Sequence, residues 1–354
     1  MRPSVALIAS ILAATTGVSC ASRLFQNLVT FGDSYTDNGR LAYYIDNNGN
    51  PPPAGTLQQQ SNVTSTGGYA WGQFVQQSTG AAYFDYAISG ATCSNEVISR
   101  YFPTIKKPFP SVVDDELPSF LADVEVKTLY LNRTVGNTVY ALWIGTNDLG
   151  FNGFLTDSQA SGEKGEEKGA NFRLSGTGLA QGLDMGTKLS QTNITTYIDC
   201  VWSVFDAIYS TGGRRFVLLN TAPLQFAPAY ASQSNGGVGD NQYWTNKTLY
   251  NQTEYQYKLL EYTQLVNRLF VYGVAFETLV KARWPGATID VFDVNSLMTD
   301  IYENPSAYLE APANVTGYFH HCEAANNSIC ANQPNSLDTF LWYDELHPSI
   351  RTGE

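Results

Sequence analysis

The sequence has few basic residues, and this shortage narrows what it can bind. Lys and Arg number 20 against 32 Asp and Glu in 354 residues, so the formal net charge is −12 at pH 7. Nucleic acids bind to clustered Lys and Arg, and anionic membrane surfaces attract the same residues. We therefore expect no nucleic-acid partner, and neutral molecules such as sugars and esters remain as candidate ligands.

Long apolar runs are missing beyond the N-terminus. No later segment reaches the roughly 18 unbroken apolar residues of a membrane span, so none is expected. The chain begins with the positive pair Met1-Arg2, continues with an apolar stretch at 5–14 and then has small residues at 18–22. This order is typical of a secretory signal peptide over residues 1–21, with a buried N-terminal helix as the alternative. We expect a secreted, extracellular protein.

Cysteine is scarce, but its number is even once Cys20 is lost with the leader. The four that remain predict two disulfides in an oxidising compartment. Cys322 and Cys330 close a short loop, so we pair them and join Cys93 to Cys200, although two other connectivities remain open. The tight C-x-x-C spacing of a zinc site is absent from the sequence, so no metal is expected.

Sites for N-glycosylation are frequent. The N-x-S/T pattern occurs at Asn62, Asn132, Asn193, Asn246, Asn251, Asn314 and Asn326. Some of these matches arise by chance, but their density indicates a glycosylated extracellular surface.

Strand-like and helix-like segments alternate along the chain. We expect strands at 27–31, 82–87, 138–144, 215–220 and 288–292, and helices at 69–79, 111–125, 195–211 and 252–283. The strand at 138–144 is apolar throughout, as a parallel strand buried on both faces should be. The helix at 195–211 places on one face Ile198, Val201, Trp202, Phe205 and Ile208. This alternation predicts an α/β three-layer sandwich whose mostly parallel five-stranded sheet is flanked by helices.

One segment interrupts the alternation. Residues 158–192 are first dense in charge and then rich in glycine, without periodicity. A structureless loop longer than about 15 residues is uncommon inside a compact domain. We predict a single domain over 22–354 with this irregular insertion, which is either a mobile flap beside the site or a translated intron.

Two short motifs near opposite ends of the chain point to chemistry. They are F-G-D-S-Y-T-D at 31–37, directly after the first predicted strand, and D-E-L-H-P at 344–348. A serine at the end of a strand, on a tight turn that glycine makes possible, exposes its hydroxyl. Ser34 then needs a base to take its proton, and the base needs a carboxylate to orient it. His347 and Asp344 supply both, so the motifs together predict a serine esterase.

The remaining polar residues near these motifs have simpler interpretations. Asp33 adjoins Ser34, but neighbouring side chains point apart, so we interpret Asp33 as structural. The other two histidines, His320 and His321, stand beside Cys322. A surface or loop role is expected for them, with a metal-binding pair as the alternative.

Four sequence blocks carry a resemblance to a known superfamily. They are F-G-D-S-Y-T-D-N-G at 31–39, Y-A-I-S-G-A-T-C-S-N at 86–95, G-T-N-D-L at 145–149 and D-E-L-H-P-S at 344–349. In this order they resemble the SGNH/GDSL hydrolases, and within them the fungal secreted acetylesterases of carbohydrate esterase family 16. The resemblance covers nearly all of 24–349 apart from the insertion.

The resemblance implies roles for individual residues. Ser34 would be the nucleophile, His347 the general base and then the general acid, and Asp344 the group that orients it. The oxyanion hole would consist of the Ser34 and Gly90 backbone N–H groups and the Asn147 side-chain amide. All three follow predicted strands, so they belong on the rim of the sheet where ligands bind. No metal or organic cofactor is implied.

The resemblance also implies a substrate class, namely acetyl esters of carbohydrates such as hemicellulose oligosaccharides. Candidate aromatic faces for a sugar are Tyr35, Tyr69 and Trp71, although such residues more often belong to the core. A lipase or phospholipase for longer acyl esters is the first alternative. A non-catalytic secreted carbohydrate-binding protein is the second. The expected partner is a small-molecule or oligosaccharide ester, bound by a monomer.

Overall fold

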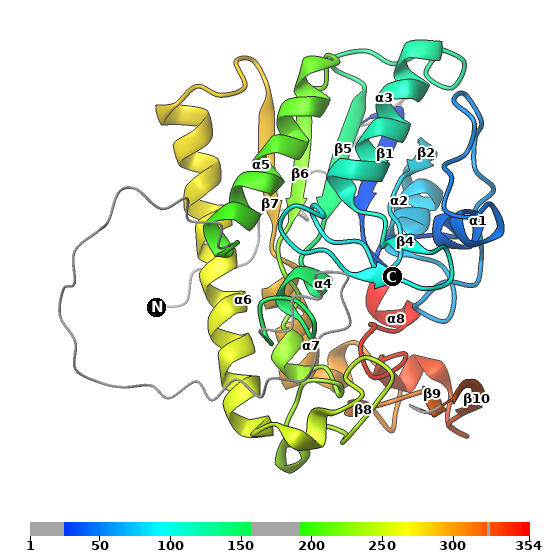
Figure 1. Cartoon of the computed structure of the whole chain (residues 1–354), viewed down its shortest axis with the longest axis vertical. Coiled ribbons are helices and arrows are strands. Elements are labelled where there is room, and N and C mark those ends of the chain that lie inside the picture. Colours follow the sequence, from blue (N-terminus) through cyan, green and yellow to red (C-terminus); the bar gives the residue numbers. More distant parts are fainter. Residues whose placement is uncertain (1–24, 157–191, 324–325) are drawn as a thin grey trace, which may run out of the picture.

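The computed structural model of the chain describes residues 25–156, 192–323 and 326–354. Its centre is a five-stranded sheet in the order β2-β1-β5-β6-β7, and every neighbouring pair is parallel (Figure 1). The strands are β1 Asn27–Gly32, β2 Ala82–Asp85, β5 Thr138–Trp143, β6 Arg215–Leu219 and β7 Thr288–Phe292. The predicted strands and the predicted three-layer α/β class are thereby confirmed.

Helices flank this sheet, and α3 and α5 lie in front of it in Figure 1. The helices are α1 Arg40–Asp46, α2 Trp71–Thr79, α3 Leu117–Val126, α4 Thr146–Leu149, α5 Ile194–Ser210, α6 Gln252–Ala275, α7 Val294–Glu303 and α8 Ile350–Gly353. The five residues predicted to share one face of α5 are all buried. The Asn193 side chain caps this helix by accepting the N–H groups of Thr195 and Thr196, as a helix N-terminus requires.

Strands β8, β9 and β10 and helix α8 lie beyond one end of the sheet, in the lower half of Figure 1, and β4 lies higher, beside α1 and α2. The short strands are β3 Tyr101–Phe102, β4 Lys107–Pro108, β8 Asn314–Tyr318, β9 His320–Glu323, β10 Asn326–Asn332 and β11 Phe340–Trp342. The antiparallel hairpin β9–β10 and the parallel pair β8–β11 bring the C-terminal part of the chain to the carboxyl ends of the large sheet.

The structure adds elements that the sequence prediction missed and shortens one that it overextended. Helix α7 carries a usable signal, because Asp293 caps it and the buried residues Val294, Met298 and Ile301 recur at helical spacing. The helix predicted at 252–283 is α-helical to Ala275 and continues as one π-helical turn, Phe276–Val280. Hydrophobic spacing alone does not distinguish these two helix types.

Some predictions lie wholly or partly outside the described residues. They are the signal peptide at 1–21 and, apart from Thr192, the insertion at 158–192; the single domain over 22–354 also stays a prediction. Among the glycosylation candidates, four are exposed, namely Asn62, Asn132, Asn193 and Asn251. Asn246 and Asn314 are partly buried, and the side chain of Asn326 is outside the description.

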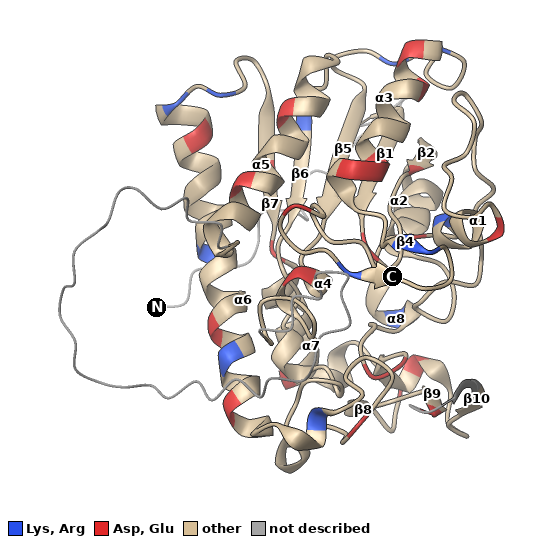
Figure 2. Ribbon diagram, in the orientation of Figure 1, with Lys and Arg blue, Asp and Glu red and all other residues tan. Residues whose placement is uncertain are grey.

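Charged residues of both signs are dispersed over the folded chain. Figure 2 shows Lys and Arg spread over separate elements and interspersed with acidic residues. Within the three described ranges, no helix combines the length and the apolar character needed to cross a bilayer.

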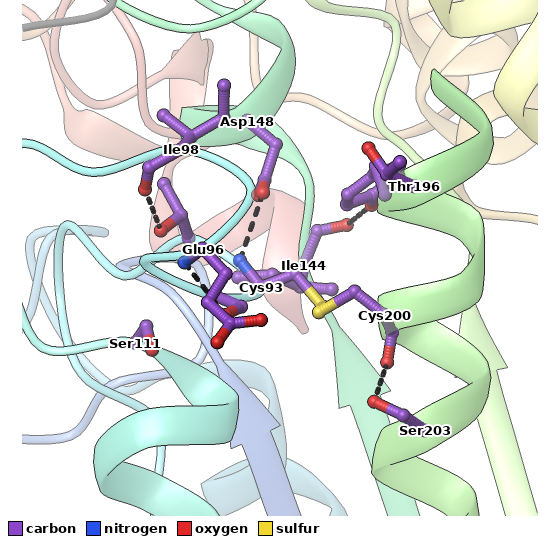
Figure 3. Close-up of a disulfide and its surroundings, with 12 residues drawn as sticks. Cys93, Glu96, Ile98, Ser111, Ile144, Asp148, Thr196, Cys200 and Ser203 are labelled. Carbon is purple, nitrogen blue, oxygen red and sulfur yellow. Dashed lines mark hydrogen bonds between the residues drawn. A yellow bond between two sulfur atoms is a disulfide. The ribbon is translucent and has the colours of Figure 1, made fainter. Parts of the chain in front are cut away.

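Both predicted disulfides are present, which confirms the preferred connectivity. Cys93–Cys200 joins the segment after β2 to helix α5 across 107 residues of sequence (Figure 3). Cys322–Cys330 closes the hairpin β9–β10 across 8 residues. In the chain-entropy description a disulfide stabilises by restricting the unfolded chain, and the restriction grows with loop length.

Removal of the two disulfides should therefore have unequal effects on stability. Replacing Cys93 and Cys200 by Ser should lower the free energy of unfolding by about 5 kcal/mol, and replacing Cys322 and Cys330 by about 2.5 kcal/mol. Urea unfolding of the two double variants, followed by circular dichroism, measures both losses. A larger loss from the short loop would contradict the entropic explanation for this protein.

Candidate active site

Ser34 and His347 meet although 313 residues separate them. Ser34 follows β1, and His347 lies in the loop between β11 and α8. The Ser34 Oγ is 2.7 Å from His347 Nε2, and His347 Nδ1 is 2.9 Å from Asp344 Oδ2. The carboxylate assigns the imidazole proton to Nδ1. Nε2 is then left able to accept the proton of the serine hydroxyl.

The turn that carries Ser34 requires glycine at position 32. Gly32 has a φ of 146°, and a Cβ there would lie 2.1 Å from the backbone oxygen of Trp143. Asp33 Oδ1 accepts the N–H of Tyr35 at 3.0 Å, which agrees with the structural role expected for Asp33. Burial raises the pKa of Asp33 to about 6, although the hydrogen bond from Tyr35 opposes this shift.

Asp344 is held by several donors. Its Oδ1 accepts the backbone N–H groups of Leu346 and His347, each at 2.8 Å, and its Oδ2 accepts the Tyr243 hydroxyl at 2.6 Å. Burial by itself would raise the pKa of Asp344. The charge of His347 and the hydrogen bonds from His347 and Tyr243 outweigh burial and hold that pKa below its usual value. Asp344 is therefore an ionised carboxylate with a fixed orientation.

Glu345, the next residue, anchors the same loop to other parts of the fold. Its carboxylate is fully buried and lies 2.5 Å from His321 Nδ1 through Oε1, while Oε2 accepts from Gln242 at 3.0 Å. Its backbone oxygen accepts the N–H of Ala229 at 2.7 Å. His321 belongs to β9, so the hairpin closed by Cys322–Cys330 directly contacts the loop that carries Asp344 and His347. The sequence analysis did not single out Glu345.

The metal-pair alternative for the two adjacent histidines finds no support in this arrangement. His320 Nδ1 pairs with Asn332 Oδ1 at 2.6 Å, and its ring stacks on Tyr343 with centroids 5.1 Å apart. His320 also lies close to Cys322 and Cys330, within the reach of a single ion. The two sulfurs are joined in a disulfide, however, and cannot act as thiolate ligands.

The expected oxyanion donors follow three neighbouring strands. Ser34 comes after β1, Gly90 after β2 and Asn147 after β5, and the strand order places these three ends side by side. In the described part of the chain, neither the Ser34 N–H nor the Gly90 N–H has an acceptor. The Asn147 amide donates to the Ala91 oxygen at 2.8 Å, which occupies one of its two N–H groups.

Position 90 requires glycine for steric reasons. Its φ is 87°, and a Cβ at this position would lie 2.4 Å from the ring of Phe109. Glycine therefore lets the backbone turn here without a clash.

Buried carboxylates connect the loop after β1 to the loop after β2. Glu116 accepts the N–H of Gly32 at 3.0 Å and the N–H of Ile88 at 3.1 Å, and Asp37 accepts the N–H of Ser89 at 2.7 Å. Burial raises the pKa of Glu116 well above its usual value. Asp37 is part of the first motif and could have been recognised, whereas nothing in the sequence around Glu116 indicates that it reaches these loops.

A third connection holds the segment after Gly90 to the segment that carries Asn147. Asp148 Oδ1 accepts the backbone N–H of Cys93 at 3.0 Å, beside the disulfide to Cys200 (Figure 3). The loop after β2 is thus tied covalently to α5 and by a hydrogen bond to α4.

The aromatic candidates for sugar contact have different positions. Tyr35 is 1% exposed, and its hydroxyl donates to the Leu346 oxygen at 2.8 Å. Its ring cannot present a face to a sugar, so the expected role of Tyr35 in substrate binding is corrected to support of the loop that carries His347. Tyr69 is 38% exposed. Trp71 is half-buried, with its indole N–H bonded to the Thr36 hydroxyl at 3.1 Å. The last two stay candidates.

A parallel α/β sheet with a Ser–His–Asp set at the carboxyl ends of its strands is the arrangement of a serine hydrolase. The model of the family described as GDSL-like Lipase/Acylhydrolase matches residues 28–352, which include all three side chains. The chain therefore belongs to the GDSL-like lipase/acylhydrolase family and is a carboxylic ester hydrolase.

Two curated relatives agree with this family. The chain is 51% identical over 325 residues to an acetylesterase of Hypocrea jecorina, which covers 92% of this chain and 84% of that protein. It is 26% identical over 209 residues to an acetylesterase of Thermothelomyces thermophilus, which covers 57% of this chain and 55% of that protein. The resemblance to SGNH/GDSL hydrolases and fungal acetylesterases is confirmed.

Buried carboxyl groups near the site predict how stability depends on pH. Burial raises the pKa of Asp33 to about 6 and that of Asp148 to about 7; burial and the charge of Asp37 raise that of Asp85 to about 7. All three exceed the unfolded value of 3.8, so the native state keeps protons that the unfolded chain releases between about pH 4 and 7. The free energy of unfolding should fall as the pH rises through this window.

Melting temperatures measured between pH 4.5 and 8 test this slope, and we expect a lower value at pH 8 than at pH 5. Asp148→Asn should flatten the slope because it removes one buried titrating group, whereas the exposed control Asp46→Asn should not. Asp344 has a lowered pKa, so its contribution to the free energy of unfolding falls as the pH falls. This loss occurs only below about pH 4, where protonation removes the hydrogen bonds that stabilise the carboxylate. A melting temperature that rises from pH 5 to 8 would disprove the prediction.

Proposed function

We propose that this protein hydrolyses acetyl esters of carbohydrates through an acyl-serine intermediate. The observation that carries the proposal is the 2.7 Å contact between Ser34 Oγ and His347 Nε2, with Asp344 on the other imidazole nitrogen. The acetyl preference is supported by the two relatives, which are named acetylesterases.

The proposed reaction has two halves. Ser34 Oγ attacks the ester carbonyl carbon while His347 Nε2 takes the hydroxyl proton, and the charge on the carbonyl oxygen is met by N–H donors of Ser34, Gly90 and Asn147. The imidazolium then gives its proton to the leaving alcohol, and acetyl-Ser34 remains. In the second half, water loses a proton to His347 and attacks the acetyl carbonyl, which releases acetate and restores the Ser34 hydroxyl.

Asp344 contributes to both halves without taking a proton. As an ionised and fixed acceptor it keeps the Nδ1–H tautomer of His347 in place and stabilises the imidazolium that forms in each half. Asp344 and His347 lie three residues apart in one short loop, so a single segment carries both side chains.

We further infer that the protein acts outside the cell as a glycosylated monomer. The two disulfides support an oxidising compartment. The exposed sequons support glycosylation, and the leader-like residues 1–21 support export. Deglycosylation, followed by mass measurement and gel filtration of the secreted protein, tests all three points.

Replacement of the proposed nucleophile should abolish hydrolysis and leave the fold intact. Ser34→Ala should lower kcat on 4-nitrophenyl acetate by about 10⁴-fold or more, because no other hydroxyl stands against His347 Nε2 in the described residues. The control Ser210→Ala changes an exposed serine at the end of α5 and should keep full activity. A folded Ser34→Ala protein with near wild-type activity would disprove the serine mechanism.

Acyl length should separate the proposed function from its alternatives. We expect a higher kcat/KM for acetyl than for octanoyl 4-nitrophenyl esters, followed by release of acetate from acetylated xylo- and cello-oligosaccharides. Higher kcat/KM on octanoyl esters, or activation at a lipid interface, would instead indicate a lipase. A folded protein that binds the oligosaccharides and hydrolyses no ester would indicate a non-catalytic carbohydrate-binding protein.

A further inference from the structure

Tyr243 stands at the carboxylate end of the Ser–His–Asp set, and no sequence motif indicates it. Its hydroxyl donates to Asp344 Oδ2 at 2.6 Å and lies 3.3 Å from His347 Nδ1. Its ring meets the imidazole edge-on, with centroids 5.3 Å apart. One side chain therefore touches both the carboxylate and the base.

The segment that carries Tyr243 is rigidly built. Asn241 Oδ1 accepts the backbone N–H groups of Tyr243 and Trp244, at 3.0 and 3.1 Å, and the Trp244 side chain is fully buried. Gln242, between them, donates to Glu345. Two successive residues of this turn thus hold two successive carboxylates of the catalytic loop.

We propose that Tyr243 is a positioning residue that fixes the carboxylate of Asp344 against His347 and sets the pH range in which the pair is catalytically competent. This role rests on the function proposed above for Ser34 and His347. Asp344 Oδ2 receives two hydrogen bonds, one from the Tyr243 hydroxyl and one from His347 Nδ1. A donor on the same oxygen draws charge away from the imidazole side and prevents rotation of the carboxylate.

Other charged and titratable groups face this cluster, but they are engaged elsewhere. Glu345 is paired with His321 and Gln242, and the Tyr35 hydroxyl donates to a backbone oxygen. Asp33, next to Ser34, also interacts with the charge of His347, and Tyr343 interacts with the charge of Asp344. Burial and the nearby Asp344 raise the pKa of Tyr243 well above its usual value, so its hydroxyl remains a donor throughout the working range.

The test is Tyr243→Phe, which removes one oxygen and keeps the ring. Without the Tyr243 hydroxyl, the full negative charge of Asp344 acts on the imidazole of His347 and favours its protonated form. We expect the acid limb of the kcat/KM profile to move to higher pH by about half a unit or more. We also expect kcat to fall about 10-fold with KM nearly unchanged, because a hydrogen bond to a charged group is lost in the reacting set.

A matched control is available in the same protein. The Tyr86 hydroxyl also donates to a buried aspartate, Asp123 Oδ2, at the same 2.6 Å. Tyr86→Phe should cost stability, but it should leave the pH profile and kcat per active site at wild-type values. Titration with a serine-reactive phosphonate counts active sites in each variant, which separates loss of folded enzyme from loss of rate.

A double-mutant cycle with Asp344→Asn tests whether Tyr243 acts through Asp344. If it does, Tyr243→Phe should have little further effect in the Asp344→Asn background. A Tyr243→Phe profile that coincides with wild type, or an undiminished effect in the Asp344→Asn background, would overturn the inference. Ser34→Ala is measured in parallel: if it stays active, the proposed function fails, and if it is inactive while Tyr243→Phe behaves as wild type, the positioning role alone fails.

Discussion

The fold has to bring Ser34 and His347 within hydrogen-bond distance, and most of the structure around the site contributes to this contact. It joins a turn near the start of the described chain to a loop near its end, so neither residue can be placed by its own neighbours. The parallel sheet places Ser34, because it directs the ends of β1, β2 and β5 to one rim. The short strands β8, β9, β10 and β11 place His347, because they bring its loop to that rim.

Buried carboxylates hold the loops on the rim, in addition to the apolar packing of Tyr35, Ile88 and Ala91. Glu116, Asp37 and Asp148 each accept backbone N–H groups from the loops that carry Gly32, Gly90 and their neighbours. Burial raises the pKa of Glu116 and that of Asp148, and such a carboxylate is costly at neutral pH because its charged form is poorly solvated. The fold thus loses some stability at neutral pH, while hydrogen bonds to these carboxylates hold the loops after β1 and β2 in place.

The loop that carries Asp344 and His347 is held from three directions. Tyr35 bonds the backbone at Leu346, Tyr243 bonds Asp344, and His321 bonds Glu345 from the disulfide-closed hairpin. Since each contact comes from a different part of the chain, a small displacement of the loop would break several bonds at once. This arrangement limits the motion of His347 relative to Ser34, and fixed geometry of this kind is a large part of serine catalysis.

The sequence by itself determined the class of fold and the five strands, gave a preferred pairing of the four cysteines, and predicted the Ser34, Asp344 and His347 set. Apolar periodicity, glycine turns and short motifs are local signals, and they are strong when a strand end and a reactive residue coincide. Only the tertiary structure decided which side chains support that set: it placed Tyr35 in the core, and it brought Glu116 to Gly32, His321 to Glu345 and Tyr243 to Asp344. The physical reason is that each of these contacts links elements far apart in sequence. A buried polar side chain must form a hydrogen bond, but the residues next to it in the sequence do not reveal which distant group will be its partner.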